Sequence, residues 1–182
     1  MPHDFPRTLK ERRTLLASLY DALERELGPM NWWPANTPFE VCIGAILTQN
    51  APWTGVTRSI LNMKSAGLFG VDEINGIDES VLADLIRPSI YYHQKARRLK
   101  AFCRFLAEKY DNRIENMASE DITKSRDMLL ALPGIGPETA DSILLYALGK
   151  PLFVVDAYTA RIFGRHGITD ETYGYEELRM FF

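Results

Sequence analysis

The spacing of apolar side chains is the feature that most narrows the folds open to this chain. Over residues 8–27 they recur three and four positions apart, with charged residues on the opposite face, which is typical of an amphipathic helix. The same period returns in almost every later segment, and no two adjacent segments alternate apolar and polar residues with period two. We therefore predict an all-α fold without a β-sheet.

Capping and breaking residues set the ends of the first predicted helices. Thr37 precedes Pro38 and stands three residues before Glu40, which is the pattern of a capping box. Asp78 is the predicted N-cap of a short helix that stops at the Arg-Pro pair of residues 87–88.

Further helices are expected along the rest of the chain. The longest is predicted over residues 92–110, with one apolar face. Shorter helices are predicted at 124–131, 137–148 and 156–166, with an extended run at 152–156 before the last. The residues of the long apolar face are Ala96, Leu99, Phe102, Cys103 and Leu106, and Gly167 is the expected C-terminal cap of the last helix.

The stretch LPGIGPETA, residues 132–140, places two glycines before a helix that starts at Pro137. Gly134 and Gly136 supply backbone angles that other residues avoid, so they predict a tight reversal between two helices, with Ile135 packed between the helices. The missing side chains also let a ligand approach the main chain, where the helix start offers N–H groups to a phosphate. An ordinary helical hairpin explains the same glycines.

Charge is clustered along the chain. The formal net charge is −3, which argues against a nucleic-acid function based on overall charge. Residues 87–113, however, hold eight basic residues against two acidic ones, and phosphate contacts need only such local neutralisation. A solvated helix face is the alternative explanation for any one of these basic residues.

Composition excludes several classes of protein. Cys42 and Cys103 are too few for a disulfide framework, a four-cysteine zinc site or an iron–sulfur cluster. The first thirteen residues contain no apolar core, so we expect no secretory signal and a cytoplasmic protein. No apolar run near them is long enough for a membrane span. The sequence stops on two phenylalanines within an amphipathic segment, so we expect the natural chain to continue.

The segment LPGIGPETADSILLYALGKPLFVVDAYTARI resembles the helix–hairpin–helix, Gly/Pro-rich loop and aspartate signature of the endonuclease III superfamily of DNA repair glycosylases. The likeness extends upstream to ILTQN and IRPSIYYHQKARRLKAF and covers most of residues 30–182. It implies a two-domain helical fold that binds double-stranded DNA in a cleft between the domains. We place one domain at 1–35 and 152–182 and the other at 36–151, with the hairpin near 125–149.

The resemblance implies that Asp156 is the catalytic carboxylate. Aspartate at a helix start is also an ordinary N-cap, and the two roles are compatible. Breaking an N-glycosidic bond builds positive charge on the deoxyribose, which a fixed carboxylate stabilises while it orients or deprotonates the attacking water.

Family members that also cleave the DNA strand carry a lysine two residues after the second hairpin glycine, whose amine forms an imine with the sugar. This chain has Glu138 at that position. A carboxylate cannot form an imine, so we predict base removal without lyase activity. Interaction with the helix dipole is the alternative role of Glu138.

The tryptophans lie together near the start of the chain. The run WWP followed by ILTQN resembles the monofunctional 3-methyladenine DNA glycosylase branch, whose pocket stacks the flipped base between aromatic rings. The resemblance implies a base pocket of Trp33, Pro34 and Trp53, suited to an alkylated, cationic purine that leaves without a general acid. Core packing is the alternative for at least one tryptophan, and Trp32 belongs to the same cluster.

The resemblance also implies DNA contacts. Gln49 corresponds to the residue that family members insert into the gap left by the flipped nucleotide. We expect a monomer associated with the nucleoid, no cofactor beyond a monovalent cation at the carbonyls of Leu132 and Gly134, and no membrane partner. The other residues implied in DNA binding are His93, Lys95, Leu132, Gly134, Ile135, Gly136 and Thr139.

Two other functions stay open at this point. The first is an endonuclease III-like glycosylase for oxidised pyrimidines or mismatches with lyase activity, which a cluster-binding cysteine set in a longer chain would favour. The second is a non-enzymatic hairpin module that binds DNA. The tryptophans argue against the first, and Asp156 in its motif argues against the second.

Overall fold

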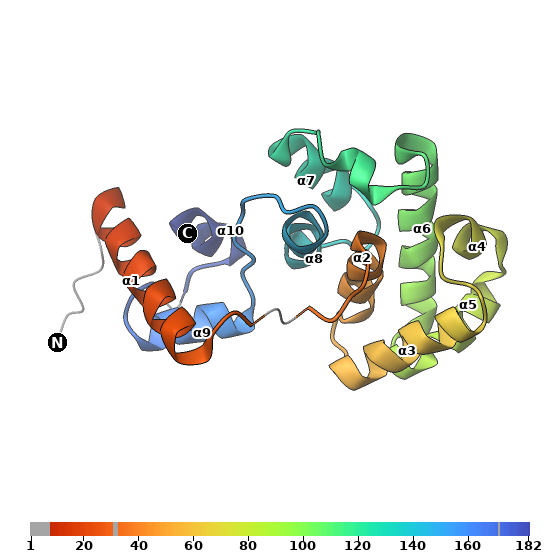
Figure 1. Ribbon diagram of the computed structural model, residues 1–182, viewed down its shortest axis with the longest axis horizontal. Coiled ribbons are helices and arrows are strands. Elements are labelled where there is room, and N and C mark those ends of the chain that lie inside the picture. Colours follow the sequence, from red (N-terminus) through yellow and green to blue (C-terminus); the bar gives the residue numbers. More distant parts are fainter. Residues whose placement is uncertain (1–7, 31–32, 171) are drawn as a thin grey trace. The chain divides into compact units, whose positions relative to one another are not determined.

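The computed structural model describes residues 8–30, 33–170 and 172–182 of the chain, and in these ranges it contains helices and no strand (Figure 1). The all-α prediction is confirmed. No helix in the described part is long and apolar enough to cross a membrane. The α-helices are α1 (Leu9–Leu27), α2 (Pro38–Leu47), α3 (Trp53–Ser65), α4 (Val71–Gly76), α5 (Glu79–Leu85), α6 (Tyr92–Tyr110), α7 (Ile122–Leu130), α8 (Pro137–Ser142), α9 (Ala157–Arg165) and α10 (Tyr175–Phe181).

Shorter helical turns connect some of these helices. Two 3-10 turns span Arg87–Ser89 and Ile114–Met117, and a π-helical segment over Ile143–Ala147 continues α8. The chain divides into two compact units, one with the described residues of 1–34 and 153–182 and one with residues 35–152. The assignment of functional domains to these units stays a prediction.

The predicted ends of the long helix are confirmed, whereas the capping box at Thr37 is formed only in part. The Thr37 hydroxyl accepts a hydrogen bond from the Glu40 amide, as predicted. The Glu40 carboxylate accepts instead from the Asn36 amide, at 3.0 Å, and pairs with the Lys64 ammonium at 2.6 Å. Because its carboxylate has these partners, Glu40 is buried although it is charged. Asp78 stands at the N-cap of α5, but its side chain forms no cap hydrogen bond.

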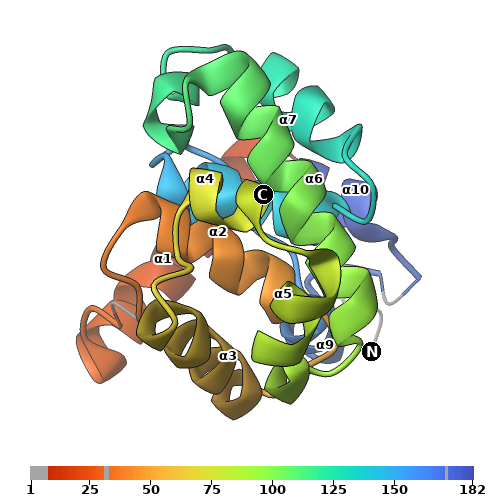
Figure 2. The ribbon, with the colours of Figure 1, turned by 90° about the vertical axis from the view of Figure 1, so that its right-hand side faces the viewer.

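Helix α2 forms the centre of the larger unit. Every residue from Glu40 to Leu47 is buried, and the helix contacts α3, α6, α8 and the π-helical segment. Figure 2 shows α6 passing beside α4 and α5, its closest packing partners. The five residues predicted to form the apolar face of α6 have no exposed surface, so that prediction is confirmed.

The smaller unit buries few side chains. Helices α1 and α9 contain no buried residue, and in the described part of this unit only Val155, Thr169, Leu178 and Phe181 are buried. Aromatic rings connect the linker before α9 with the end of α10: the rings of Phe153 and Phe182 stack with centroids 3.9 Å apart. This linker leads from the larger unit to the start of α9.

Candidate functional site

The hairpin between α7 and α8 is a tight turn held by main-chain bonds. The Ile135 amide donates to the Leu132 carbonyl at 3.1 Å, and Gly134 adopts φ +78°, an angle that favours glycine. The Ile135 side chain is buried, as expected of a residue packed between the two helices. Helix α7 starts two residues earlier than predicted, because the Asp121 carboxylate caps it by accepting from the amides of Thr123 and Lys124.

The second hairpin glycine differs from the first. Gly136 is the N-cap of α8 with φ −91° and ψ 175°, an extended conformation open to any residue. The expectation that both glycines supply forbidden backbone angles is therefore wrong for Gly136. A Cβ added at this position would meet no atom within 4 Å, so this glycine leaves open space in front of the main chain at the start of α8.

A buried ion pair joins the two helices of the hairpin. The Arg126 guanidinium of α7 donates to both carboxylate oxygens of Asp141 in α8, at 2.7 and 3.3 Å. The Asp141 side chain is 1% exposed. Two parallel bonds of this kind fix orientation as well as distance, so the pair fixes how α7 and α8 lie on either side of the turn. Nothing in the spacing of the two residues distinguished them from surface charges.

Gln49, just beyond α2, connects that helix to the hairpin. Its Nε2 donates to the Gly134 carbonyl at 3.0 Å and to the Thr139 hydroxyl at 2.9 Å. Its Oε1 accepts from Nη1 of Arg98 in α6. The structure thus brings together Gln49, Gly134 and Thr139, three residues predicted separately to contact DNA. Arg98 was missed as a specific contact, because the sequence marked it only as one of eight basic residues.

The structure contradicts the predicted role of Lys95 in DNA binding. The side chain has no exposed surface, and its ammonium donates to the main-chain carbonyls of Leu47, at 2.8 Å, and of Ser89. Burial, with a smaller effect of the nearby Arg98 charge, lowers the pKa of Lys95 from 10.5 to about 8. An ammonium enclosed in this way cannot reach a DNA phosphate, so Lys95 fixes the end of α2 against the turn that precedes α6.

The remaining cations of the basic stretch are divided between packing and surface. The Lys100 ammonium donates to main-chain carbonyls of Ile74, Asn75 and Ile77, which makes it a structural contact. His93 is exposed on the first turn of α6, with its ring beside that of Tyr92. The exposed cations are fewer than the sequence suggested, and they are Arg87, Arg97, Arg104, Lys109 and Arg113.

Asp156 is the N-cap of α9. Its Oδ1 accepts from the Thr159 amide at 2.7 Å and from the Thr159 hydroxyl at 2.8 Å. Among the residues that the structure describes, no group donates to Oδ2. The cap therefore fixes the carboxylate at a partly buried helix start and leaves one oxygen available to a ligand or a water molecule.

The aromatic residues of the predicted pocket occupy different units. Trp33 is half-buried and Pro34 is exposed in the smaller unit, whereas Trp53 is half-buried at the first position of α3 in the larger unit. Trp32 lies outside the described residues. The assignment of the three residues to one base pocket stays a prediction.

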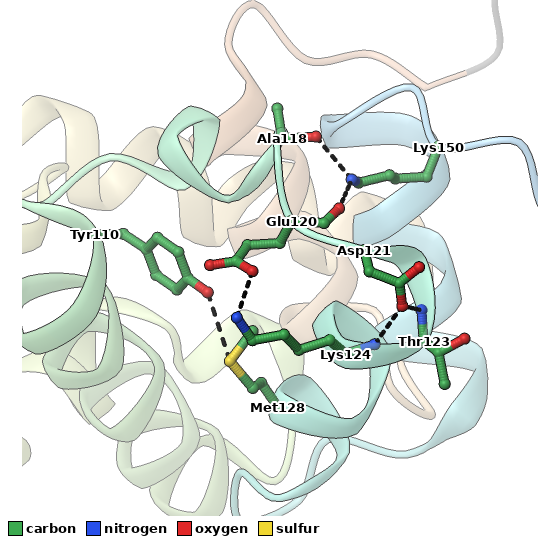
Figure 3. Close-up of polar contacts among 8 residues, drawn as sticks. All are labelled: Tyr110, Ala118, Glu120, Asp121, Thr123, Lys124, Met128 and Lys150. Carbon is green, nitrogen blue, oxygen red and sulfur yellow. Dashed lines mark hydrogen bonds and ion pairs between the residues drawn. The ribbon is translucent and has the colours of Figure 1, made fainter.

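The position of the expected lysine is occupied by an exposed carboxylate, because Glu138 stands in the first turn of α8. Lys150, in the loop after the second hairpin helix, has a structural role (Figure 3). Its ammonium donates to the carbonyls of Ala118, at 2.7 Å, and Glu120. It therefore connects the loop after the second hairpin helix to the segment in front of the first.

Metal-binding side chains do not gather in the described ranges, where no three His, Cys, Asp or Glu residues could share an ion. The two carbonyls predicted to hold a monovalent cation both accept hydrogen bonds, Leu132 from Ile135 and Gly134 from Gln49. A carbonyl oxygen has a second lone pair, so a cation would share these oxygens with the bonds of the turn.

Known proteins resemble this chain in sequence and in fold. The sequence pattern of HhH-GPD superfamily base excision DNA repair proteins matches residues 43–182. A protein of Methanocaldococcus jannaschii, whose name assigns it provisionally to the DNA repair glycosylases, is 45% identical over 177 residues, 96% of this chain and 80% of that protein. Endonuclease III of Thermotoga maritima is 34% identical over 71% of this chain, but the match spans only 57% of that enzyme.

Solved structures show the same fold. The 3-methyladenine DNA glycosylase MagIII of H. pylori, crystallised with 1,N6-ethenoadenine, is 35% identical and superimposes with a TM-score of 0.80 over 94% of this chain and 80% of MagIII. A trapped covalent complex of endonuclease III with DNA has a TM-score of 0.76 at 21% identity. At that identity the likeness concerns the fold alone.

Proposed function

Because the chain belongs to the HhH-GPD superfamily of base excision DNA repair proteins, we propose that it is a DNA glycosylase that hydrolyses the N-glycosidic bond of a flipped, alkylated purine and leaves the strand intact. Double-stranded DNA with a damaged base is the proposed partner, bound by a monomer in the cytoplasm at the nucleoid. Solved structures of endonuclease III, which has the same fold, contain bound DNA and support this partner.

The observation that carries the proposal is the fixed carboxylate of Asp156. Two bonds from Thr159 hold Oδ1, so the orientation of the carboxylate is set before any substrate binds. In the proposed reaction, Oδ2 faces the deoxyribose as the bond to the base breaks and the sugar becomes positive. Such a preorganised charge stabilises the transition state without reorganisation, and the same oxygen orients or deprotonates the attacking water.

Glu138 supports hydrolysis without strand cleavage. A lyase step needs an amine that attacks C1′ of the sugar, and a carboxylate holds the position of that amine. Lys95 and Lys150 do not replace it, because the ammonium groups of both are bonded to main-chain carbonyls.

The tryptophans and one structural relative support an alkylated purine as substrate. Indole faces attract cations, and a purine alkylated at N3 is cationic. The MagIII structure, 35% identical to this chain, holds an adenine derivative. We propose Trp33, Pro34 and Trp53 as the residues around the base, and Gln49, His93 and the hairpin residues Leu132, Gly134, Ile135, Gly136 and Thr139 as DNA contacts.

A direct experiment compares substrates in the presence of borohydride. Duplexes that contain an alkylated purine, an oxidised pyrimidine or a G·T mismatch are incubated with the protein, and free base, abasic sites and protein–DNA adducts are measured. We expect the alkylated purine to be released fastest, with abasic sites and no trapped adduct, since trapping requires an imine. A trapped adduct would contradict hydrolysis without lyase action. Faster release of the pyrimidine would contradict the proposal that the substrate is an alkylated purine. No release from any duplex would contradict the proposal that the protein is a glycosylase.

A further inference from the structure

Arg98 differs from the other cations of α6 in its partners. Its neighbour Arg97 pairs with the Glu79 carboxylate at 3.5 Å. The Arg98 guanidinium, in contrast, is half-buried and has no carboxylate partner among the described residues, and its one acceptor is the neutral carboxamide of Gln49. Lys95, one turn earlier, adds a second positive charge nearby. Within the described ranges, neither of these two cations forms an ion pair with a carboxylate.

The Arg98 side chain also lies directly on the hairpin turn. A Cβ built on Gly134 would collide with Cγ, Cδ and Nε of Arg98, so the arginine occupies the space that the glycine leaves. Two residues further on, the space in front of Gly136 is open. An anion that approached the main chain at Gly136 would come close to a guanidinium with unused N–H donors.

We propose that Arg98 binds the DNA phosphate at the hairpin, and that this phosphate takes the guanidinium away from Gln49 and so frees the Gln49 carboxamide. The inference deepens the proposed function, because it rests on DNA binding at the hairpin. Its physical reason is charge: a guanidinium–phosphate bond is charge-assisted and bidentate, whereas the bond to a carboxamide has a neutral acceptor.

The exchange gives Gln49 two states. In the free protein its carboxamide is bonded to Gly134, Thr139 and Arg98, so it cannot extend toward DNA. When the phosphate removes the bond from Arg98, only the two neutral bonds donated by Nε2 remain, and we expect these to break readily and to let the carboxamide leave the turn. Binding of the DNA backbone thereby precedes the release of the side chain that the proposed function inserts beside the flipped nucleotide.

The phosphate contact is tested by the salt dependence of binding to an undamaged duplex. The slope of log K against log salt is negative, and Arg98→Met should make it less steep by roughly 0.9, the value for one phosphate contact. Arg97→Met, which removes the same charge from an arginine already paired with Glu79, should keep the wild-type slope. Arg98→Lys, which retains the charge, should also keep it. An unchanged slope for Arg98→Met, or an equal loss for both methionine variants, would overturn the contact.

The release of Gln49 is tested by NMR of its side-chain amide, identified by its absence from Gln49→Met. We expect slow solvent exchange of these protons in the free protein and at least tenfold faster exchange on saturation with undamaged duplex. Protection that persists with DNA bound would overturn the exchange of partners. Neither measurement requires base release, so a protein without glycosylase activity could still satisfy both, and an active glycosylase could fail both.

Discussion

The Nε2 atom of Gln49 lies 2.9 Å from the Thr139 hydroxyl, although 90 positions of the chain separate the two residues. This bond ties the end of α2, the most buried helix of the larger unit, to the first turn of α8. The geometry of the hairpin is therefore not set by the turn alone. Substitutions in the turn can therefore act both on the proposed phosphate contact and on Gln49.

Asp156→Asn should slow base release while it leaves the fold and DNA binding intact. Asparagine is as good an N-cap as aspartate, so α9 should keep its start, but the charge that stabilises the sugar is lost. We expect the barrier to base release to rise by about 2 to 4 kcal/mol, roughly 30- to 1000-fold in rate. Single-turnover kinetics on a duplex with an alkylated purine measure it.

The matched control is Asp170→Asn. Asp170 accepts from the amide and hydroxyl of Thr172 in the same way, but it is exposed in a turn. This variant should release base at the wild-type rate. Wild-type kinetics for Asp156→Asn as well would remove Asp156 from the mechanism.

The two hairpin glycines should respond differently to alanine. Gly134→Ala places a Cβ at positive φ and against Arg98, so we expect a loss of about 1 to 2 kcal/mol in the free energy of unfolding. Gly136→Ala has an allowed φ and open space, so its stability should stay within about 1 kcal/mol of wild type. Thermal unfolding compares them.

Gly136→Ala should nevertheless weaken binding to damaged and undamaged duplexes by the same factor, because a phosphate contact carries little sequence information. Titration of both duplexes with each variant measures this. A loss confined to damaged DNA would mean that Gly136 serves the base pocket and not the backbone.

Trp53→Ala should slow the release of an alkylated purine. Stacking of an aromatic ring on a base contributes roughly 1 to 3 kcal/mol, so a decrease of about 5- to 150-fold is expected. Trp53→Phe keeps a ring at the start of α3 and should recover most of the rate. If both variants lose the same rate, Trp53 acts through packing of α3 and not through stacking.

The buried Lys95 predicts a pH dependence of stability. Its pKa is lowered from 10.5 to about 8 in the folded protein, so between these values the unfolded chain binds more protons than the folded one. The free energy of unfolding of the wild type, relative to Lys95→Met, should therefore rise with pH from about 8 to 10.5 and stay constant below 8. The rise is at most about 1.4 kcal/mol per pH unit.

Denaturant titrations of the wild type and of Lys95→Met over this pH range measure the difference in their free energies of unfolding. The two buried cysteines titrate in both proteins, so their contribution cancels in this difference. A constant difference from pH 7 to 10.5 would show that the Lys95 amine keeps its ordinary pKa.

Sequence periodicity predicted the fold well where helices are amphipathic. The ends of α6 and its apolar face were predicted correctly, because one stripe of side chains faces the core. The family resemblance is also confirmed. Helices α3 and α4 were not predicted, since glycines and polar residues interrupt their pattern.

The contacts of the site could be predicted less well than the fold. A lysine in a basic stretch suggests a phosphate contact, but the carbonyls that enclose Lys95 come from residues 6 and 48 positions away. Two partners of Gln49 are more remote, at 85 and 90 positions along the chain. Such bonds depend on tertiary packing, and no local pattern in the sequence records them.

The unlike surroundings of the two hairpin glycines have a consequence for how this domain diverges. Gly134 is required by the protein itself, through its backbone angle and the arginine that covers it, whereas only a ligand would require Gly136. In a lineage that keeps the fold but abandons DNA, selection on the first glycine should persist and selection on the second should relax. A descendant that keeps the first glycine but has another residue at the second position would therefore be expected to have lost the ligand.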